Sequence, residues 1–348
     1  MNYQLIRCDM EHPGDVSSLQ SLLEKGKVKA ETIKAIIAQT EGDGYARGYA
    51  TLAFQNLLSS YLEISKEDVF EQIPMMMIGK TGGLMTPHYT LFIKEDDCIE
   101  WVSEEKRFAF GVASTPILKR NEIGTVKQVD YVTEAVIQAM KEANIDSFED
   151  VKCVEVKCPW GDGGSLAKAA SALGSAIALK EIERHKVSQD SLNQDHSLFS
   201  LKTSVSAGQE QVSARVIVMG NSRSSSSDLY IGAGVMEDAL DLNGLREAFV
   251  NAGLEGGTPL SDEERERVVQ VFVNAGADAL STVRGKRHTM HTDALAMHSG
   301  ILAKAVANAV VGSFVGETRI LCSAGSEHQG PQGSNLVSPV IRVKGDAL

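Results

Sequence analysis

Basic side chains are scarce in this sequence relative to acidic ones. Its 348 residues include 34 Lys and Arg but 46 Asp and Glu, so the formal net charge is −12 at pH 7 and the isoelectric point is near 5.2. A surface this acidic repels the phosphates of nucleic acids and of anionic lipids. We therefore expect neither a nucleic-acid partner nor a membrane partner.

Long apolar runs are also lacking. No stretch of about 18 consecutive apolar residues occurs, which argues against a transmembrane helix. The opening residues MNYQLIRCDMEHPGD lack the basic and apolar segments of a secretory signal, so we expect a cytoplasmic protein. Hydrophobic residues make up 43% of the chain and charged residues 23%, which is typical of a globular protein. The length predicts two or three structural units.

Cysteines are few, and none belongs to a CxxC pair. The five are Cys8, Cys98, Cys153, Cys158 and Cys322. An odd, scattered set argues against a disulfide framework and against a zinc site. We expect reduced thiols, most of them in the core.

The chain is rich in glycine, with 31 residues, and it repeats one order of elements. Three stretches each contain an amphipathic helix, a short apolar strand, an alanine-rich helix, a second apolar strand and a glycine turn. We predict an α/β fold of three similar units, over residues 1–104, 105–245 and 246–348. The turns SAGQE at 206–210 and SAGSE at 323–327 also match in letters, which supports a true repeat.

The expected elements follow from hydrophobic periodicity. Helices are expected at 18–26, 49–62, 132–143, 166–182, 245–254 and 301–316. Strands are expected at 33–38, 73–78, 151–159, 214–222, 268–276, 318–327 and 337–343. The charged stretch 261–267 is interpreted as a solvated helix face capped by Ser261 or Asp262.

Spacing aligns the units at their strand ends. Lys157 ends the first apolar strand of the second unit, and Ser206 follows it by as many residues as Ser323 follows Asn274 in the third unit. The corresponding positions of the first unit are Gln39 and Ile78, with a shorter connection. Only the middle unit therefore has both a lysine and a serine.

A lysine beside a serine is suited to amide hydrolysis. A lysine that is desolvated or crowded by other cations loses basicity and can remove the serine proton. The serine then attacks a carbonyl carbon, and backbone N–H groups at a glycine-rich turn stabilise the oxyanion. The alternative is that Lys157 is a surface charge and Ser206 a turn former. The repeat around the two residues favours the catalytic interpretation.

Motifs over nearly the whole chain belong to one pattern. They are TEGDG at 40–44, RGYAT at 47–51, MTPH at 85–88, VKCP at 156–159, ASALG at 170–174, SAGQE, VIVMGNS at 216–222, GVMEDALD at 234–241, RGKRHTM at 284–290 and SAGSEHQGPQG at 323–333. Together they resemble the ring-opening amidohydrolases typified by cyanuric acid hydrolase and barbiturase. The resemblance implies three similar α/β units with pseudo-threefold symmetry around a central active site, hydrolysis of a cyclic amide C–N bond, and a homo-oligomer, in this family a tetramer.

The resemblance also implies roles by motif position. Ser206 is the nucleophile and Lys157 its base. The groups implied to hold substrate carbonyls are Ser206 with Ala207, Ile78 with Gly79, and Ser323 with Ala324. The implied helix-borne cations are Arg47, Lys168 and Lys304, where the family usually has arginine. No cofactor is implied for the chemistry.

Departures from the family pattern predict an altered substrate. Lys168 and Lys304 offer point charges in place of a planar guanidinium fork. Ile78 places an apolar side chain where a hydroxyl would face the ring, which suits a substituent or a CH face. We therefore favour a barbiturate-like or other substituted cyclic imide over cyanuric acid. The alternative is that these positions bind through the backbone alone and tolerate any side chain.

The family often holds a structural Mg²⁺ or Ca²⁺ near the final glycine-rich loop, bound by oxygen ligands. The candidates by position are Ser326, Gln329, Gly330, Pro331 and Ser334, with Glu317 or Asp278 as a source of charge. Gly276 replaces the acidic ligand expected after the third unit's first strand, which argues against the ion.

Other patterns have a plainer interpretation. His288, His291 and His298 have metal-like spacing, but no HExxH or carboxylate pattern accompanies them, so we interpret them as hydrogen-bonded or surface histidines. Cys158 and Cys322 adjoin the assigned residues and should point to the opposite strand face as core thiols.

Two further alternatives remain. The serine-rich segment 221–227 lacks the GKS or GKT ending of a phosphate loop and is interpreted as a turn. The whole chain could also be a non-catalytic binding protein descended from the same family. Retention of Lys157 with Ser206 argues for activity, because a binding protein has no need of that pair.

Overall fold

Each sheet draws its strands from one part of the chain. The computed structural model describes residues 1–42, 44–96, 104–290 and 299–344. The first sheet has the order β1-β4-β2-β3. Its strands are β1 (Asn2–Asp9), β2 (Ile33–Gln39), β3 (Met75–Ile78) and β4 (His88–Glu95), and the helices of this part are α1 (Ser17–Glu24), α2 (Gly44–Leu62) and α3 (Lys66–Gln72).

The second and third sheets follow in the chain. The second has the order β5-β8-β6-β7, with β5 (Arg107–Ser114), β6 (Val151–Pro159), β7 (Thr203–Gly208) and β8 (Arg215–Ser222), and with α4 (Val126–Glu142) and α5 (Ser165–Ala178). The third has the order β10-β15-β11-β14, and β9 also pairs with β15. Its elements are β9 (Leu229–Ile231), β10 (Gly234–Met236), β11 (Val268–Ala275), β14 (Leu321–Ala324), β15 (Asn335–Arg342), α6 (Leu242–Asn251), α7 (Asp262–Arg267) and α8 (Ser299–Val315). A small hairpin joins β12 (Thr282–Val283) to β13 (Lys286–Arg287).

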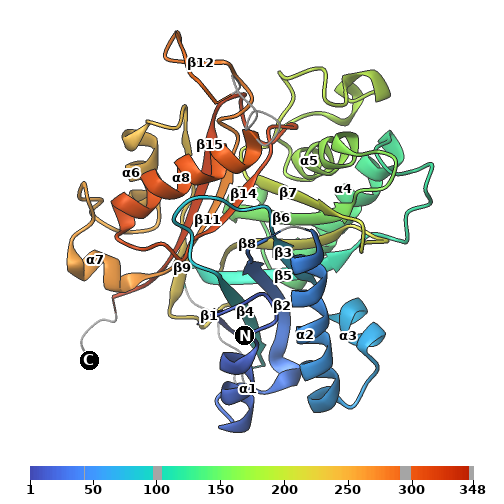
Figure 1. The fold of residues 1–348 in the computed structure, drawn as a ribbon, viewed down its shortest axis with the longest axis vertical. Helices are drawn as coiled ribbons and strands as arrows, with labels where there is room; N and C mark the ends of the chain where they lie inside the picture. The colour runs from blue at the N-terminus through green and yellow to red at the C-terminus, as the bar shows by residue number, and fades with distance from the viewer. Residues whose placement is uncertain (43, 97–103, 291–298, 345–348) are drawn as a thin grey trace.

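The three sheets share one topology. In each, the opening strand, which is β1, β5 or the short pair β9 and β10, pairs antiparallel with the last strand, and the last strand pairs antiparallel with β2, β6 or β11. That strand then pairs parallel with β3, β7 or β14. The predicted α/β fold of three similar units with pseudo-threefold symmetry is confirmed. The sheets meet at the centre of the molecule, with α2, α5 and α8 outside them (Figure 1).

The expected boundary at 245/246 does not follow the sheets. Strands β9 and β10 precede it, yet both pair with β15 of the third sheet. By sheet membership the third unit begins in the segment between β8 and β9. Strands of three residues are too short to show an alternating pattern, so hydrophobic periodicity did not predict them. The edge strands β1 and β5, and β4, were not predicted either.

The serine-rich segment forms this connection between the second and third units. The Ser225 hydroxyl donates to the carbonyl of Phe108 at 2.6 Å, and the Ser227 hydroxyl donates to the carbonyl of Tyr3 at 2.5 Å. Both serines are buried. The segment therefore satisfies backbone acceptors of β5 and β1, in line with its interpretation as a turn.

A capping box explains where α7 begins, and a glycine explains how closely α4 and α5 pack. Ser261 caps α7: its hydroxyl accepts from the Glu264 N–H at 3.3 Å, and its own N–H donates to the Glu264 carboxylate at 2.9 Å. Helices α4 and α5 pack closely because Gly174 has no side chain. A Cβ there would lie 2.6 Å from the carbonyl oxygen of Val129.

The largest core lies where the sheets converge. Phe92 of β4 packs edge-on against Phe110 of β5, with ring centroids 5.2 Å apart, and its ring lies 6.1 Å from that of Phe272 in β11. All three rings are fully or almost fully buried. One phenylalanine from each sheet thus meets near the pseudo-threefold axis, and aromatic contacts of this kind stabilise the convergence.

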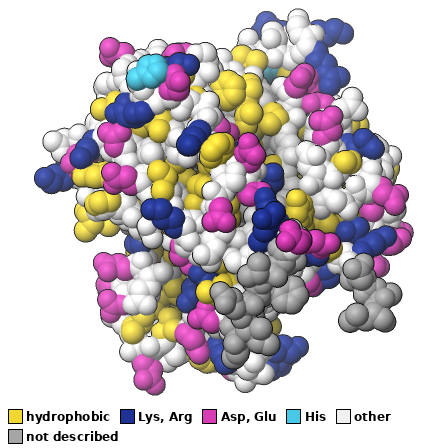
Figure 2. Space-filling model, turned by 180° about the vertical axis from the view of Figure 1, so that it is seen from behind, with side chains coloured by type: hydrophobic (Ala, Val, Ile, Leu, Met, Phe, Trp, Pro, Cys, Tyr) yellow, Lys and Arg dark blue, Asp and Glu magenta, His cyan; other side chains and the backbone are white. Residues whose placement is uncertain are grey.

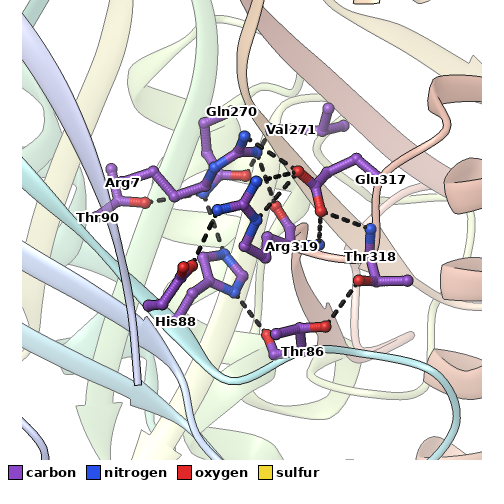
Figure 3. A network of polar contacts seen from close by, with 10 residues as sticks. Arg7, Thr86, His88, Thr90, Gln270, Val271, Glu317, Thr318 and Arg319 are labelled. Atoms are coloured by element: carbon purple, nitrogen blue, oxygen red, sulfur yellow. Dashed lines mark hydrogen bonds and ion pairs between the residues drawn. The ribbon is translucent and has the colours of Figure 1, made fainter. Parts of the chain in front are cut away.

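A polar network joins the first unit to the third (Figure 3). Glu317 accepts from Arg319 at 2.6 Å and lies 3.2 Å from Arg7 of β1. Beside it, the side chain of Gln270 in β11 contacts the buried His88 of β4 at 3.1 Å. Burial lowers the pKa of His88 to about 4, so its ring is neutral at pH 7. The network thus connects the first unit to the third through polar groups that have hydrogen-bond or ion-pair partners.

The surface bears mixed charge. Figure 2 shows acidic and basic side chains interspersed on the face opposite to that of Figure 1, with no large field of one sign. None of the helices in the described part of the chain is both long and apolar enough to span a bilayer.

Candidate active site

A cavity of about 520 Å³ opens where the sheets converge. Its lining includes every residue to which we assigned catalysis or substrate binding: Arg47, Ile78, Gly79, Lys157, Lys168, Ser206, Ala207, Lys304, Ser323 and Ala324. Sequence reasoning did not name the other lining residues, which are Met77, Lys80, Trp160, Gly208 and Gln209. Each lies within a few positions of an assigned residue, so extending the motifs along the chain would have found them.

The strand register aligns the three residue pairs that spacing had matched. Lys157 of β6 is the direct partner of Ser206 in the parallel strand β7. Gln39 pairs in the same way with Ile78, and Asn274 with Ser323. Partners in a parallel pair direct their side chains to the same sheet face. The lysine and the serine therefore share one face at the cavity.

Lys157 is buried and its basicity is reduced. Its side chain is 1% exposed, and its Nζ donates to the carbonyl of Met77 at 3.2 Å. Burial, opposed by the carboxylate of Glu210 and aided by the charges of Arg47 and Lys168, lowers the pKa of Lys157 to about 8. An amine in this range is neutral in a useful fraction of molecules near neutral pH and can accept a proton.

At the cavity, side chains of one unit form hydrogen bonds with the backbone of another, at the residue that precedes Ile78, Ser206 or Ser323. The Lys157 Nζ holds the carbonyl of Met77, the residue before Ile78. The Gln39 Oε1 accepts from the N–H of Cys322, the residue before Ser323, at 2.8 Å. The third contact of this kind runs from the N–H of Val205 to the Oε1 of Gln329, at 2.6 Å. Gln39 thus holds the strand position that Lys157 has in the second unit, but it accepts from an N–H where Lys157 donates to a carbonyl, and sequence reasoning overlooked this contact.

The helix-borne cations differ in their surroundings. Lys304 donates to the carbonyl of Gly79 at 2.9 Å, and burial lowers its pKa to about 8. Lys168 forms an ion pair with Glu327 at 2.8 Å. The stem of Arg47 lies over Gly79, where a Cβ would be 2.8 Å from its Cγ and Cδ. The Nε of Arg47 has no hydrogen-bond partner within the described ranges.

The metal-loop candidates bond to one another and to the rest of the protein. The Ser334 hydroxyl donates to the carbonyl of Pro331 at 2.6 Å, and the Ser334 carbonyl accepts from Gly276 N–H at 3.0 Å. Gly276 permits this approach, since a Cβ would lie 2.6 Å from that oxygen. Gln329 is engaged by Val205 and Glu327.

The carboxylates of two nearby glutamates are engaged in ion pairs. Glu327 pairs with Lys168, and Glu317, considered as a source of charge, pairs with Arg319 and Arg7. Across residues 1–42, 44–96, 104–290 and 299–344, no group of three or more His, Cys, Asp or Glu side chains could hold a metal. An ion bound by oxygens of Ser326, Gln329, Gly330, Pro331 and Ser334 stays a prediction.

The plainer interpretations of histidine and cysteine agree with the contacts. The His288 ring contacts the carbonyl of Leu280 at 2.6 Å, whereas His291 and His298 lie outside the described residues. Cys158 and Cys322 are fully buried, and burial raises their pKa to about 11 and about 12. Both are neutral thiols at pH 7 and do not line the cavity. Cys8 and Cys153 are buried too, and Cys98 lies outside the described residues.

The family described as "Amidohydrolase ring-opening protein" matches residues 4–161 and 162–342. The chain belongs to this ring-opening amidohydrolase family. A cyclic amide hydrolase of Rhodococcus sp is 38% identical over 351 residues, which cover 96% of this chain and 100% of that protein. A cyanuric acid amidohydrolase of Enterobacter cloacae is 38% identical over 370 residues, covering 98% and 100%.

Solved structures agree with the sequence relatives. A cyanuric acid hydrolase, described as an evolutionary innovation by structural concatenation, superposes with a TM-score of 0.91 at 33% identity, covering 98% of this chain and 99% of that one. The cyanuric acid hydrolase of A. caulinodans has a TM-score of 0.87 at 31% identity, covering 99% of each chain. The family predicted from the motifs is confirmed, and this ring-opening amidohydrolase is a hydrolase acting on cyclic amides.

Proposed function

We propose that this ring-opening amidohydrolase cleaves a C–N bond of a barbiturate-like or otherwise substituted cyclic imide, with Ser206 as nucleophile and Lys157 as base. The observation that carries the proposal is the register pairing of these two residues at the cavity, together with the low pKa of the buried lysine. Neutral Lys157 takes the Ser206 hydroxyl proton as Oγ attacks a ring carbonyl carbon.

The steps that follow use groups already at the cavity. The carbonyl oxygen gains negative charge as the tetrahedral intermediate forms, and in this proposal the backbone N–H groups of Ser206 and Ala207 stabilise it. Collapse breaks the ring C–N bond, and the ammonium of Lys157 returns its proton to the leaving nitrogen. Water, deprotonated by the same lysine, then attacks the acyl carbon; the Ser206 Oγ–C bond breaks, and the ammonium of Lys157 returns the proton to Oγ. The cations Arg47, Lys168 and Lys304 balance the partial negative charge of the remaining carbonyls.

The substrate preference rests on one side chain. Ile78 stands at the cavity where Ser206 and Ser323 have hydroxyls, and it is buried. A hydrocarbon wall favours a ring that presents a CH or alkyl group there, because a polar ring atom would lose its hydrogen bond to water without replacement. Cyanuric acid is the competing substrate, since the relatives at 38% identity include proteins named for it.

The test is a substrate panel followed by loss of ring ultraviolet absorbance. Barbituric acid, an alkyl-substituted barbiturate and cyanuric acid are offered to the native chain, to Ser206→Ala and to the matched Ser323→Ala. We expect turnover by the native chain, none by Ser206→Ala, and a raised KM with residual turnover for Ser323→Ala. Equal turnover by native protein and Ser206→Ala would refute the serine mechanism. No turnover by the native chain would support a non-catalytic binding protein instead.

Ile78→Ser tests the preference separately. We expect the ratio of kcat/KM for barbituric acid to that for cyanuric acid to fall by about tenfold or more, as for other single-group changes in a pocket wall. An unchanged ratio would mean that the position binds through its backbone alone.

A further inference from the structure

Glu210 directs its carboxylate back toward the proposed base. The residue follows β7, and its Oε1 lies 3.9 Å from the Nζ of Lys157. The carboxylate passes directly over Gly208, where a Cβ would lie 2.1 Å from Oε1. Gln211 Nε2 also donates to this oxygen at 3.4 Å. The position of Glu210 thus depends on the absence of a side chain at Gly208.

Of the three equivalent turns, only the turn of the second unit brings a carboxylate close to a strand-end lysine. Glu327 has the same place in SAGSE as Glu210 in SAGQE, but it turns to Lys168 at 2.8 Å. In the first unit Gly82 takes that place. The carboxylate that faces a strand-end lysine is therefore found beside the pair proposed for catalysis.

The charges around Lys157 explain why a carboxylate is useful there. Burial and the neighbouring cations Arg47 and Lys168 weaken the amine as a base, while the Glu210 carboxylate acts in the opposite direction. When the amine takes the serine proton, it becomes a buried ammonium, which is costly without a counter-charge. A nearby carboxylate stabilises that ammonium in the transition state, as the aspartate of a serine hydrolase triad does for imidazolium.

We propose that Glu210 is a positioning residue that acts through Lys157, its carboxylate stabilising the ammonium formed when Ser206 loses its proton. The inference rests on the proposed function. In the proposed step the proton moves from the Ser206 Oγ to the Lys157 Nζ as the Oγ–C bond forms, and then to the ring nitrogen as the C–N bond breaks. Glu210 takes no part in this proton transfer.

Glu210→Gln is the primary test because it removes the charge and keeps the shape. Without the carboxylate the pKa of Lys157 falls, so the acidic limb of the kcat profile should move to lower pH by roughly half to one unit. The limiting rate should fall about tenfold, because the ammonium loses its counter-charge. KM should change little, since Glu210 is not part of the cavity lining. A merely structural role would lower the rate without moving the limb.

Gly208→Ala tests the same idea with the charge retained. The new methyl group would displace the carboxylate from Lys157, and the Gly208 backbone is not left-handed, so alanine fits the strand. We expect the limb to move in the same direction as in Glu210→Gln. Glu247→Gln, on an exposed part of α6, removes one charge far from the cavity and should leave the profile unchanged.

A direct titration separates this inference from the proposed function. Lys157 is observed by NMR in protein labelled with ε-¹³C lysine, with Lys157→Met assigning its signal, in native and Glu210→Gln protein. A lower pKa of Lys157 in the variant supports the coupling even if the serine mechanism fails in the Ser206→Ala test. An unchanged pKa, or an unmoved kinetic limb in an active enzyme, overturns the inference.

Discussion

Replacing Lys157 by methionine is expected to abolish turnover and yet stabilise the fold. Burial lowers the pKa of this lysine from 10.5 to about 8, which at pH 7 corresponds to roughly 3 kcal/mol against folding. Methionine is similar in length and has no charge to bury. It gives up the hydrogen bond to the Met77 carbonyl, worth about 1 kcal/mol. We expect the free energy of unfolding at pH 7 to rise by about 1–2 kcal/mol.

The pH dependence of this gain has a definite sign. Between pH 8 and 10.5 the unfolded chain binds the lysine proton while the folded protein releases it. The cost to folding is therefore complete below pH 8 and is relieved as pH rises to 10.5. The difference in stability between Lys157→Met and native protein should be larger at pH 7 than at about pH 9.5, and most of it should be lost by then.

Urea denaturation at both pH values measures the effect. Lys119→Met is the control, because Lys119 is exposed and its replacement should shift stability little at either pH. The reasoning is refuted if Lys157→Met is less stable than native protein at pH 7. It is refuted equally if the difference in stability is the same at both pH values, since the gain would then not come from the lysine charge.

Three other predictions concern the remaining units and the surface. Asn274→Lys should not raise the hydrolysis rate. The Asn274 amide already donates to the carbonyl of Gly325 at 2.8 Å, and in the proposed mechanism the third unit only binds the substrate. A faster variant would show that the second unit was wrongly chosen as the catalytic one. In a Trp101→Phe background, a cyclic imide should change the fluorescence of Trp160 saturably, since this indole lines the cavity and is 41% exposed; an unresponsive signal would contradict binding there. Glu317→Gln should lower the free energy of unfolding by about 1–2 kcal/mol at pH 7, measured by denaturation. Burial raises the pKa of Glu317, but hydrogen bonds from Arg319 and the charge of Arg7 outweigh it and lower the pKa to about 2. The contribution of Glu317 to the free energy of unfolding is therefore present above pH 4.5 and is lost as pH falls toward 2. An effect of the substitution that is unchanged at low pH would contradict the ion-pair origin.

The repeat made the site predictable before any coordinates. Equal spacing from Lys157 to Ser206 and from Asn274 to Ser323 places each pair at the same point of two adjacent parallel strands, because each unit builds its sheet in the same order. The shorter connection in the first unit did not obscure the match of Gln39 with Ile78, because their strands show clear apolar runs. Local patterns sufficed for the two parallel strands that carry these pairs, although not for the strands β1, β4 and β5 of the same sheets.

Contacts between units could not be predicted in this way. The hydrogen bonds between Gln39 and Cys322 and between Val205 and Gln329 join residues far apart in sequence. Hydrophobic periodicity along the chain does not indicate which strand end will face a given side chain. The same holds for Glu210, whose approach to Lys157 depends on how the turn after β7 folds back over Gly208. The boundary at 245/246 was misplaced because the two short strands β9 and β10 join a sheet that the chain completes only later.

The proposed mechanism requires two lysines at the same cavity to be in opposite protonation states. Burial lowers the pKa of both Lys157 and Lys304 to about 8, yet in the proposed mechanism the first must be neutral to accept the serine proton, and the second must be charged to balance the substrate carbonyls. The charges of Arg47 and Lys168 also lower the pKa of both lysines. Rising pH therefore favours the chemical step while it weakens binding. Lys304→Arg would remove this conflict, since guanidinium stays charged, so in the proposed mechanism this variant should keep its substrate affinity to higher pH than the native protein does.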